Sequence, residues 1–106
     1  MDIVVLKQAQ KELTVAPKDI LQDVFALFSA LAGGVNLEMP VSRPLPTIAR
    51  GLHELRLSGK SGEYRVFYFI SLRDAIYVIH AGNKKTQSMS KLTKRLLRTR
   101  IRSLHG

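Results

Sequence analysis

The sequence predicts an α+β fold with an N-terminal strand, a helix pair, an antiparallel sheet of three to four strands and a basic C-terminal helix. Three observations predict it. Apolar residues recur at helical spacing before Gly33, three short β-like runs separated by turns fill Gly51–Gln87, and Met89–Leu104 combines an apolar stripe with basic residues. With 106 residues the chain is long enough for one hydrophobic core, and we expect a single domain over 1–106.

The first half supplies the N-terminal strand and the helix pair. Ile3–Leu6 is a β-branched run, Gln8–Leu13 favours a helix, and Pro17 suits the first turn of a second helix. Three- and four-residue spacings make this second helix amphipathic. Its apolar residues are Ile20, Leu21, Val24, Phe25, Leu27, Phe28 and Leu31. Gly33-Gly34 ends it, and the proline-rich residues 35–50 are interpreted as an ordered loop.

The second half supplies the sheet and the last helix. Leu52–Leu57, Tyr64–Ile70 and Ala75–Ala81 are predicted strands, joined by the turn SGKSG at 58–62 and by Leu72-Arg73-Asp74. The C-terminal segment is predicted as a helix with a single apolar face. That face consists of Met89, Leu92, Leu96, Leu97, Ile101 and Leu104. The helix pair is expected to pack on the antiparallel meander.

The net charge of +9 lies entirely in the second half of the chain. Residues 1–50 hold five Lys or Arg against five acids, whereas residues 51–106 hold twelve against three. This asymmetry favours a polyanionic partner over the alternative that the charge only maintains solubility. The chain has no cysteine, which excludes a disulfide framework and a thiolate metal site. The N-terminal residues lack signal-peptide features, and no apolar run approaches the roughly 18 residues of a membrane span, so we expect a soluble cytoplasmic protein.

Several catalytic motifs are excluded. SGKSG is not a phosphate loop, because that motif needs a glycine where Glu54 stands and a helix after the loop, whereas this segment lies between two predicted strands. His53, His80 and His105 do not have metal-ligand spacing, and there is no Gly-x-Ser-x-Gly elbow. The sequence thus indicates a hairpin turn and gives no sign of a metal, a cofactor or a hydrolytic triad.

Basic residues on the strands leave two interpretations open. Strand alternation places Arg65 on the same face as two phenylalanines, where a guanidinium needs a partner. That partner is either a carboxylate, from Glu54 or Glu63, or a bound anion clamped by Arg65 together with Arg56. For His80, near the end of the last strand, packing is the default and proton transfer the alternative. The basic residues of the last helix fit a solvated face, a macrodipole effect or a surface for a polyanion. A basic amphipathic helix can also lie on a membrane, but this one has no Trp or Phe anchor and its apolar stripe is needed by the core.

The Gly51–Gln87 segment closely resembles the HigB-like, phage-type branch of the RelE/ParE toxin superfamily. The residues that carry the resemblance are LHELR at 52–56, YRVFY at 64–68 and HAGNKKTQ at 80–87. The resemblance implies a RelE-like fold and the toxin of a type II toxin–antitoxin pair, with a helix-turn-helix antitoxin as partner. Many members of the superfamily cut mRNA in the ribosomal A site, whereas the ParE branch poisons DNA gyrase.

The function that the resemblance implies is ribosome-dependent mRNA cleavage. Arg65 and Arg56 would stabilise the phosphorane, Lys84 would protonate the leaving group or bind phosphate, and His80 would be the candidate general base. Additional phosphate contacts are expected from Lys85, Lys60, Lys91, Lys94 and Arg95. The alternatives are a gyrase inhibitor that uses the basic helix, and a nucleic-acid-binding module without activity.

Two positions differ from better-studied RelE-type sequences. Glu54 stands where those sequences carry a basic residue, and residues 84–106 contain no Tyr to stack on a base. Stacking on a base would then come from Tyr64, Tyr68 or Tyr77, or be absent.

Overall fold

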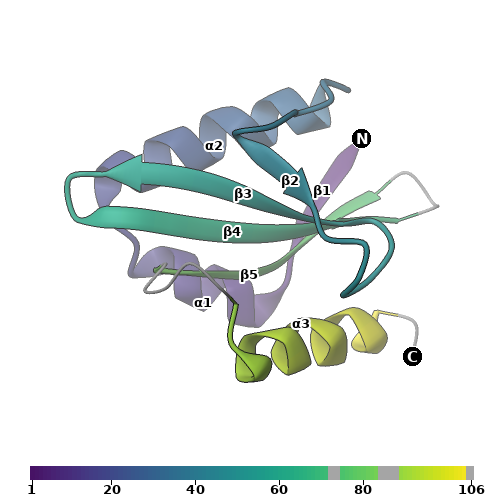
Figure 1. Cartoon of the computed structure of the whole chain (residues 1–106). Coiled ribbons are helices and arrows are strands. Elements are labelled where there is room, and N and C mark those ends of the chain that lie inside the picture. The colour runs from purple at the N-terminus through teal and green to yellow at the C-terminus, as the bar shows by residue number, and fades with distance from the viewer. Residues whose placement is uncertain (72–74, 84–88, 105–106) are drawn as a thin grey trace.

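The computed structural model describes residues 1–71, 75–83 and 89–104. They form five strands and three helices, whose order confirms the predicted α+β fold (Figure 1). In chain order these are β1 (Asp2–Val5), α1 (Lys7–Thr14), α2 (Lys18–Ala32), β2 (Ser42–Pro44), β3 (Leu52–Gly59), β4 (Gly62–Ile70), β5 (Ala75–Asn83) and α3 (Lys91–Ser103). The predicted connection at 72–74 lies outside the described residues.

The sheet has the order β1-β5-β4-β3-β2 and is mixed. β3, β4 and β5 form the expected antiparallel meander, while β1 pairs with β5 in parallel and β2 pairs with β3 antiparallel. The expectation of a three- to four-stranded antiparallel sheet is therefore corrected by a parallel strand at one edge and a short strand at the other. The loop predicted over 35–50 contains β2, which ends at Pro44; a proline without an N–H is tolerated on an edge strand.

Each face of the sheet carries its own hydrophobic cluster. α1 and α2 cover one face and α3 covers the other (Figure 1). The side chains of β4 alternate between the two clusters. Tyr64, Val66 and Tyr68 pack toward α1 and α2, whereas Phe67 and Phe69 pack toward α3. A strand of aromatic and β-branched residues is thus buried on both faces, as period-two alternation requires.

Two apolar residues predicted on buried helix faces are exposed. Phe25 is 59% exposed and Leu92 is 75% exposed. Successive residues of a helix are rotated by about 100°. Phe25 therefore lies beside the buried face of α2, and Leu92 lies nearly opposite the buried face of α3. Within the described residues, no helix is long and apolar enough to cross a membrane.

The SGKSG segment is the hairpin turn that the sequence predicts. Gly59 pairs with Gly62, leaving Lys60 and Ser61 as a two-residue loop, and Gly62 has a φ of +113°. The Lys60 backbone N–H donates a 2.9 Å hydrogen bond to the Asp19 carboxylate. The tip of the β3–β4 hairpin is thereby fixed to the first turn of α2.

Candidate anion-binding site

The strand register brings Arg56 and Arg65 together on the α3 face of the sheet. Arg56 on β3 lies directly opposite Arg65 on β4, and Arg65 lies opposite Gly82 on β5. Like charges that face each other across two strands are destabilising unless a counter-charge lies between them.

Glu54 supplies that counter-charge. Its side chain is only 2% exposed, and its carboxylate lies 3.1 Å from Arg65 Nη1 and 3.6 Å from Arg56 Nε. The interpretation of Arg65 as half of a salt bridge is therefore confirmed, with Glu54 as the partner. One carboxylate serves two guanidiniums, so the trio keeps one net positive charge. Arg65 Nε is buried without a hydrogen-bond partner in the described part of the chain.

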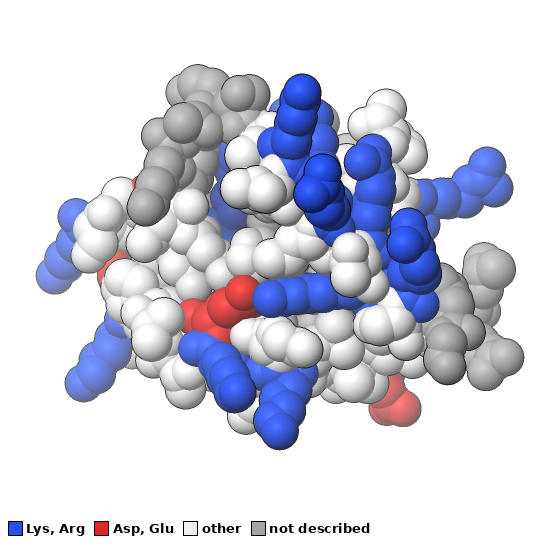
Figure 2. Space-filling view, turned by 90° about the horizontal axis from the view of Figure 1, so that it is seen from below, with Lys and Arg blue, Asp and Glu red and all other residues white. Residues whose placement is uncertain are grey.

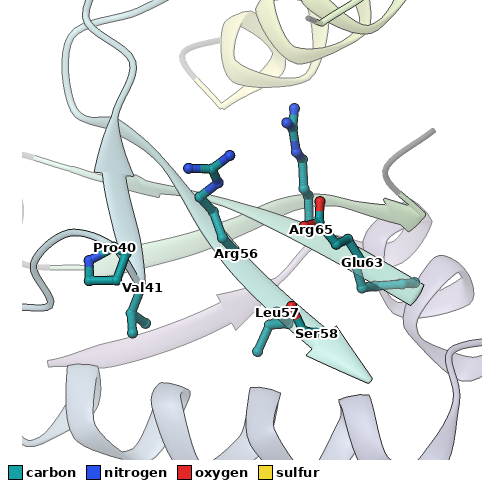
Figure 3. A pocket seen from close by; sticks show the side chains of 8 residues that line it. Pro40, Val41, Arg56, Leu57, Ser58, Glu63 and Arg65 are labelled. Atoms are coloured by element: carbon teal, nitrogen blue, oxygen red, sulfur yellow. The ribbon is translucent and has the colours of Figure 1, made fainter. Parts of the chain in front are cut away.

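An open hollow of about 340 Å³ lies beside this pair. Its lining consists of Pro40, Val41, Arg56, Leu57, Ser58, Glu63, Tyr64 and Arg65. Both arginine side chains extend to the α3 side of the sheet, whereas Leu57 points to the opposite side (Figure 3). The Arg56 backbone N–H donates a 2.9 Å hydrogen bond to the Val41 carbonyl. This bond holds Pro40 and Val41, which precede β2 and line the hollow, against β3. The arrangement suits an anion such as a phosphate group.

A β-bulge brings His80 to the same face. His80 pairs with Phe67, but Val78 pairs with Tyr68, so Ile79 is an extra residue in β5. Strict alternation from Val78 would turn His80 toward α1 and α2. Instead its ring stacks on Phe67, with centroids 5.7 Å apart and planes 14° apart. Periodicity in the sequence cannot reveal this shift.

Glu12 and Arg100 complete the surroundings of His80 and were missed by sequence reasoning. β1 pairs with β5 only as far as Val78, which leaves the following edge of β5 open. Arg100 Nη1 donates to the Ile79 carbonyl and to Glu12 Oε1, each at 2.9 Å, and Glu12 Oε1 lies 2.9 Å from His80 Nδ1. These residues are far apart in the sequence, so no local pattern could have found them.

The pKa of Glu12 is lowered by this environment. Burial alone would raise the pKa, but hydrogen bonds from Arg100 and His80, the charge of His80 and the Ala81 N–H outweigh it.

Glu12→Gln is expected to flatten the acid side of the stability profile. Because the folded-state pKa of Glu12 is depressed, its stabilising effect is complete above the ordinary glutamate pKa of about 4.3 and is lost as pH falls through the folded-state pKa. Urea unfolding over the acid range measures this dependence. Asp23→Gln, on the exposed side of α2, is the control. If the unfolding free energy of Glu12→Gln depended on acid pH as steeply as that of the wild-type protein, the expectation would be contradicted.

Two of the three tyrosines considered for base stacking are unavailable. Tyr64 and Tyr68 are 4% and 1% exposed and belong to the cluster under α1 and α2. Tyr64 donates to the Glu12 carbonyl at 3.2 Å, and the Tyr68 hydroxyl lies 2.6 Å from Ser42 Oγ. Burial raises the pKa of both phenols. The stacking role proposed for these two residues is therefore wrong, because the aromatic positions of β4 are needed by the core.

The basic residues predicted to contact RNA fall into separate places. Lys91, Lys94 and Arg95 line a second hollow, of about 480 Å³, together with Arg98, Thr99 and Arg102. We call these six residues the α3 basic surface, and Figure 2 shows Lys and Arg side chains crowding this side of the molecule. Lys60 lies away from it, at the hairpin tip beside α2. Lys84 and Lys85 lie outside the described residues. No group of three or more His, Cys, Asp or Glu within the described ranges could hold a metal ion.

The fold is similar to that of a solved structure. A chain of the crystal structure of the intact Escherichia coli RelBE toxin–antitoxin complex matches with a TM-score of 0.50 and 14% identity, over 80% of this chain and 98% of that chain. A free, doubly substituted mutant of the Escherichia coli toxin RelE matches with a TM-score of 0.47 and 16% identity, over 77% and 81%. A comparison with curated proteins finds no match. The model of the family "Phage derived protein Gp49-like" matches residues 11–102, and the chain therefore belongs to that family.

Proposed function

We propose that this protein is the toxin of a type II toxin–antitoxin pair and that it cuts mRNA on the ribosome. The observation that carries the proposal is the pair of arginines that share one buried carboxylate beside an open hollow. The two guanidiniums present donors of the kind that bind phosphate toward this hollow, whose lining also includes the carboxylate of Glu63. The RelE-like fold and the Gp49-like family support the same proposal.

The reaction that fits these residues is transfer of the RNA phosphoryl group to its own 2′-oxygen. His80 Nε2 would accept the 2′-hydroxyl proton while that oxygen attacks phosphorus. Arg65 and Arg56 would stabilise the added negative charge of the phosphorane. The bond to the 5′-oxygen then breaks, and a protonated base, for which we propose Lys84, gives the leaving oxygen its proton. The products are a 2′,3′-cyclic phosphate and a 5′-hydroxyl, and no metal or cofactor is needed.

The proposed partners follow from charge and from the related fold. We propose that the α3 basic surface and Lys85 contact RNA phosphates on the ribosome, which would also hold the mRNA in line for attack. The similar fold occurs in a toxin–antitoxin complex, and we propose a helix-turn-helix antitoxin as the second partner. The site of action would then be the cytoplasm.

Induction of the protein without an antitoxin tests the proposal. Incorporation of labelled amino acids should stop within minutes, and primer extension should show new 5′ ends within translated mRNA. Continued translation combined with DNA damage signalling would favour the gyrase-inhibitor alternative instead. If the protein bound RNA but produced no new 5′ ends on programmed ribosomes, the remaining alternative would be a nucleic-acid-binding module without activity.

His80→Asn is expected to lower cleavage about 100-fold, because loss of a general base costs about two to four powers of ten. His53→Gln is the matched control, since His53 stacks on Tyr68 on the opposite face of the sheet, with ring centroids 5.0 Å apart. Primer extension on programmed ribosomes measures both variants. Equal rates for the two variants would remove His80 from the proposed reaction.

A further inference from the structure

The contact between Glu12 and His80 fixes where the imidazole proton lies. Glu12 Oε1 and His80 Nδ1 are 2.9 Å apart, and a carboxylate oxygen can only accept. The pKa of Glu12 is lowered, so the carboxylate is ionised at neutral pH, and Nδ1 must carry the proton that it donates. Arg100 Nη1 lies 3.4 Å from the same nitrogen, but it donates to Glu12 and to the Ile79 carbonyl at shorter distances. In a neutral His80 the lone pair is therefore on Nε2.

Gly82 leaves the Nε2 side of the ring open. A Cβ built on Gly82 would lie 3.7 Å from His80 Nε2, so any side chain at this position would cover that edge of the ring. Gly82 is also the residue directly opposite Arg65. Because His80 pairs with Phe67, His80 and Arg65 are diagonal neighbours on one face, about 7–8 Å apart at the backbone. The Nε2 edge thus lies on the same face of the sheet as the arginine pair, although His80 itself does not line the hollow beside that pair.

Glu12 itself is held firmly enough to orient a ring. Arg100 binds both carboxylate oxygens, at 2.9 Å and 3.2 Å, and the Ala81 N–H donates to Oε1 at 3.3 Å. Arg100 is in turn fixed by the Ile79 carbonyl at 2.9 Å. On its other side the imidazole is held by its stack on Phe67. The ring is thus held at Nδ1 by Glu12 and on one face by Phe67, while Gly82 places no side chain over its Nε2 edge.

We propose that Glu12 is a positioning residue that holds His80 as the Nδ1–H tautomer and presents Nε2 to the Arg56–Arg65 site. This role rests on the proposed function, in which Nε2 accepts the 2′-hydroxyl proton. Glu12 would not touch the RNA; it acts through His80, as a carboxylate behind a catalytic imidazole does. The competing explanation is that Glu12 only caps the open edge of β5 and joins α1 to α3.

Nuclear magnetic resonance of the imidazole nitrogens in the free, full-length protein separates the two explanations. Long-range proton–nitrogen correlation spectra report which ring nitrogen is protonated, and His80→Asn assigns the signals. The wild-type protein should show a protonated Nδ1 and an unprotonated Nε2 for His80 at pH values where the ring is neutral. In Glu12→Ala, Arg100 is left free to donate to Nδ1, so the tautomer ratio should invert toward Nε2–H. Glu12→Gln keeps an accepting oxygen and should retain Nδ1–H.

Asp23→Ala, an acidic residue of α2 on an exposed position, is the matched control and should leave the His80 signals unchanged. A wild-type His80 in the Nε2–H form would overturn the proposal and needs no variant. An unchanged tautomer ratio in a folded Glu12→Ala would also overturn it.

Cleavage kinetics provide the second readout. Glu12→Ala should lower kcat on programmed ribosomes at least tenfold and leave KM within about twofold, because RNA contacts are unchanged. Equal losses in kcat for Glu12→Ala and Glu12→Gln would contradict a role through the tautomer. If the wild-type protein cuts no mRNA, the proposed function fails, while the tautomer measurement still decides the role of Glu12.

Discussion

Arg65→Ala is expected to abolish toxicity for two reasons that can be separated. The first is chemical, since removal of a preorganised cation at the phosphorane lowers the cleavage rate by about 100-fold or more. The second is structural, because Glu54 is 2% exposed and loses its closest cationic partner. Removing one partner of a buried ion pair leaves the other charge uncompensated and lowers the unfolding free energy by about 3 kcal/mol. The single variant therefore cannot by itself assign a catalytic role.

The double variant Arg65→Ala/Glu54→Gln separates the two effects. Neutral glutamine keeps the shape of Glu54 without the buried charge, so most of the lost unfolding free energy should return. Cleavage should remain about 100-fold low. Urea unfolding and primer extension measure the two quantities on the same preparations. Recovery of cleavage together with stability would mean that Arg65 acts only as a structural counter-ion.

Arg56→Gln is expected to give the second large effect without the structural cost. The Arg56 side chain is 36% exposed and its Nε lies 3.6 Å from Glu54, a longer contact than that of Arg65. Glu54 keeps its closer partner, so the unfolding free energy should fall by no more than about 1 kcal/mol. Cleavage should fall about 100-fold, because this guanidinium lines the hollow and has donors to spare.

Lys18→Gln is the control for Arg56→Gln. It removes one positive charge from an exposed position at the start of α2, on the other face of the sheet. A general effect of net charge would slow both variants alike. Loss of cleavage confined to Arg56→Gln would locate the effect in the arginine pair, whereas wild-type rates in a folded Arg56→Gln would exclude this arginine from the reaction.

Local patterns in the sequence predicted the meander and the face on which its arginines lie. Alternation along β4 separates Arg65 from Tyr64 and Val66, and the register of the tight hairpin then places Arg56 opposite Arg65. Glu54 stands where better-studied RelE-type sequences carry a basic residue. The structure gives a physical reason for this acidic residue, because its carboxylate offsets the repulsion between two arginines that face each other on the sheet.

The surroundings of His80 could not be predicted, because they depend on contacts between distant segments. The bulge at Ile79 reverses the face that alternation assigns to His80. Glu12 comes from α1 and Arg100 from α3, 88 residues apart, and they meet only because β1 leaves the end of β5 uncovered. The same limit explains the sheet edges, since neither the parallel pairing of β1 nor the three-residue β2 has a strong local pattern.

Cleavage of mRNA on programmed ribosomes by the purified protein tests the central claim most directly. The wild-type protein should cut mRNA at the codon in the A site and leave the same RNA intact when ribosomes are omitted, while folded Arg56→Gln should be about 100-fold slower. Intact mRNA after incubation of programmed ribosomes with folded wild-type protein would contradict the account.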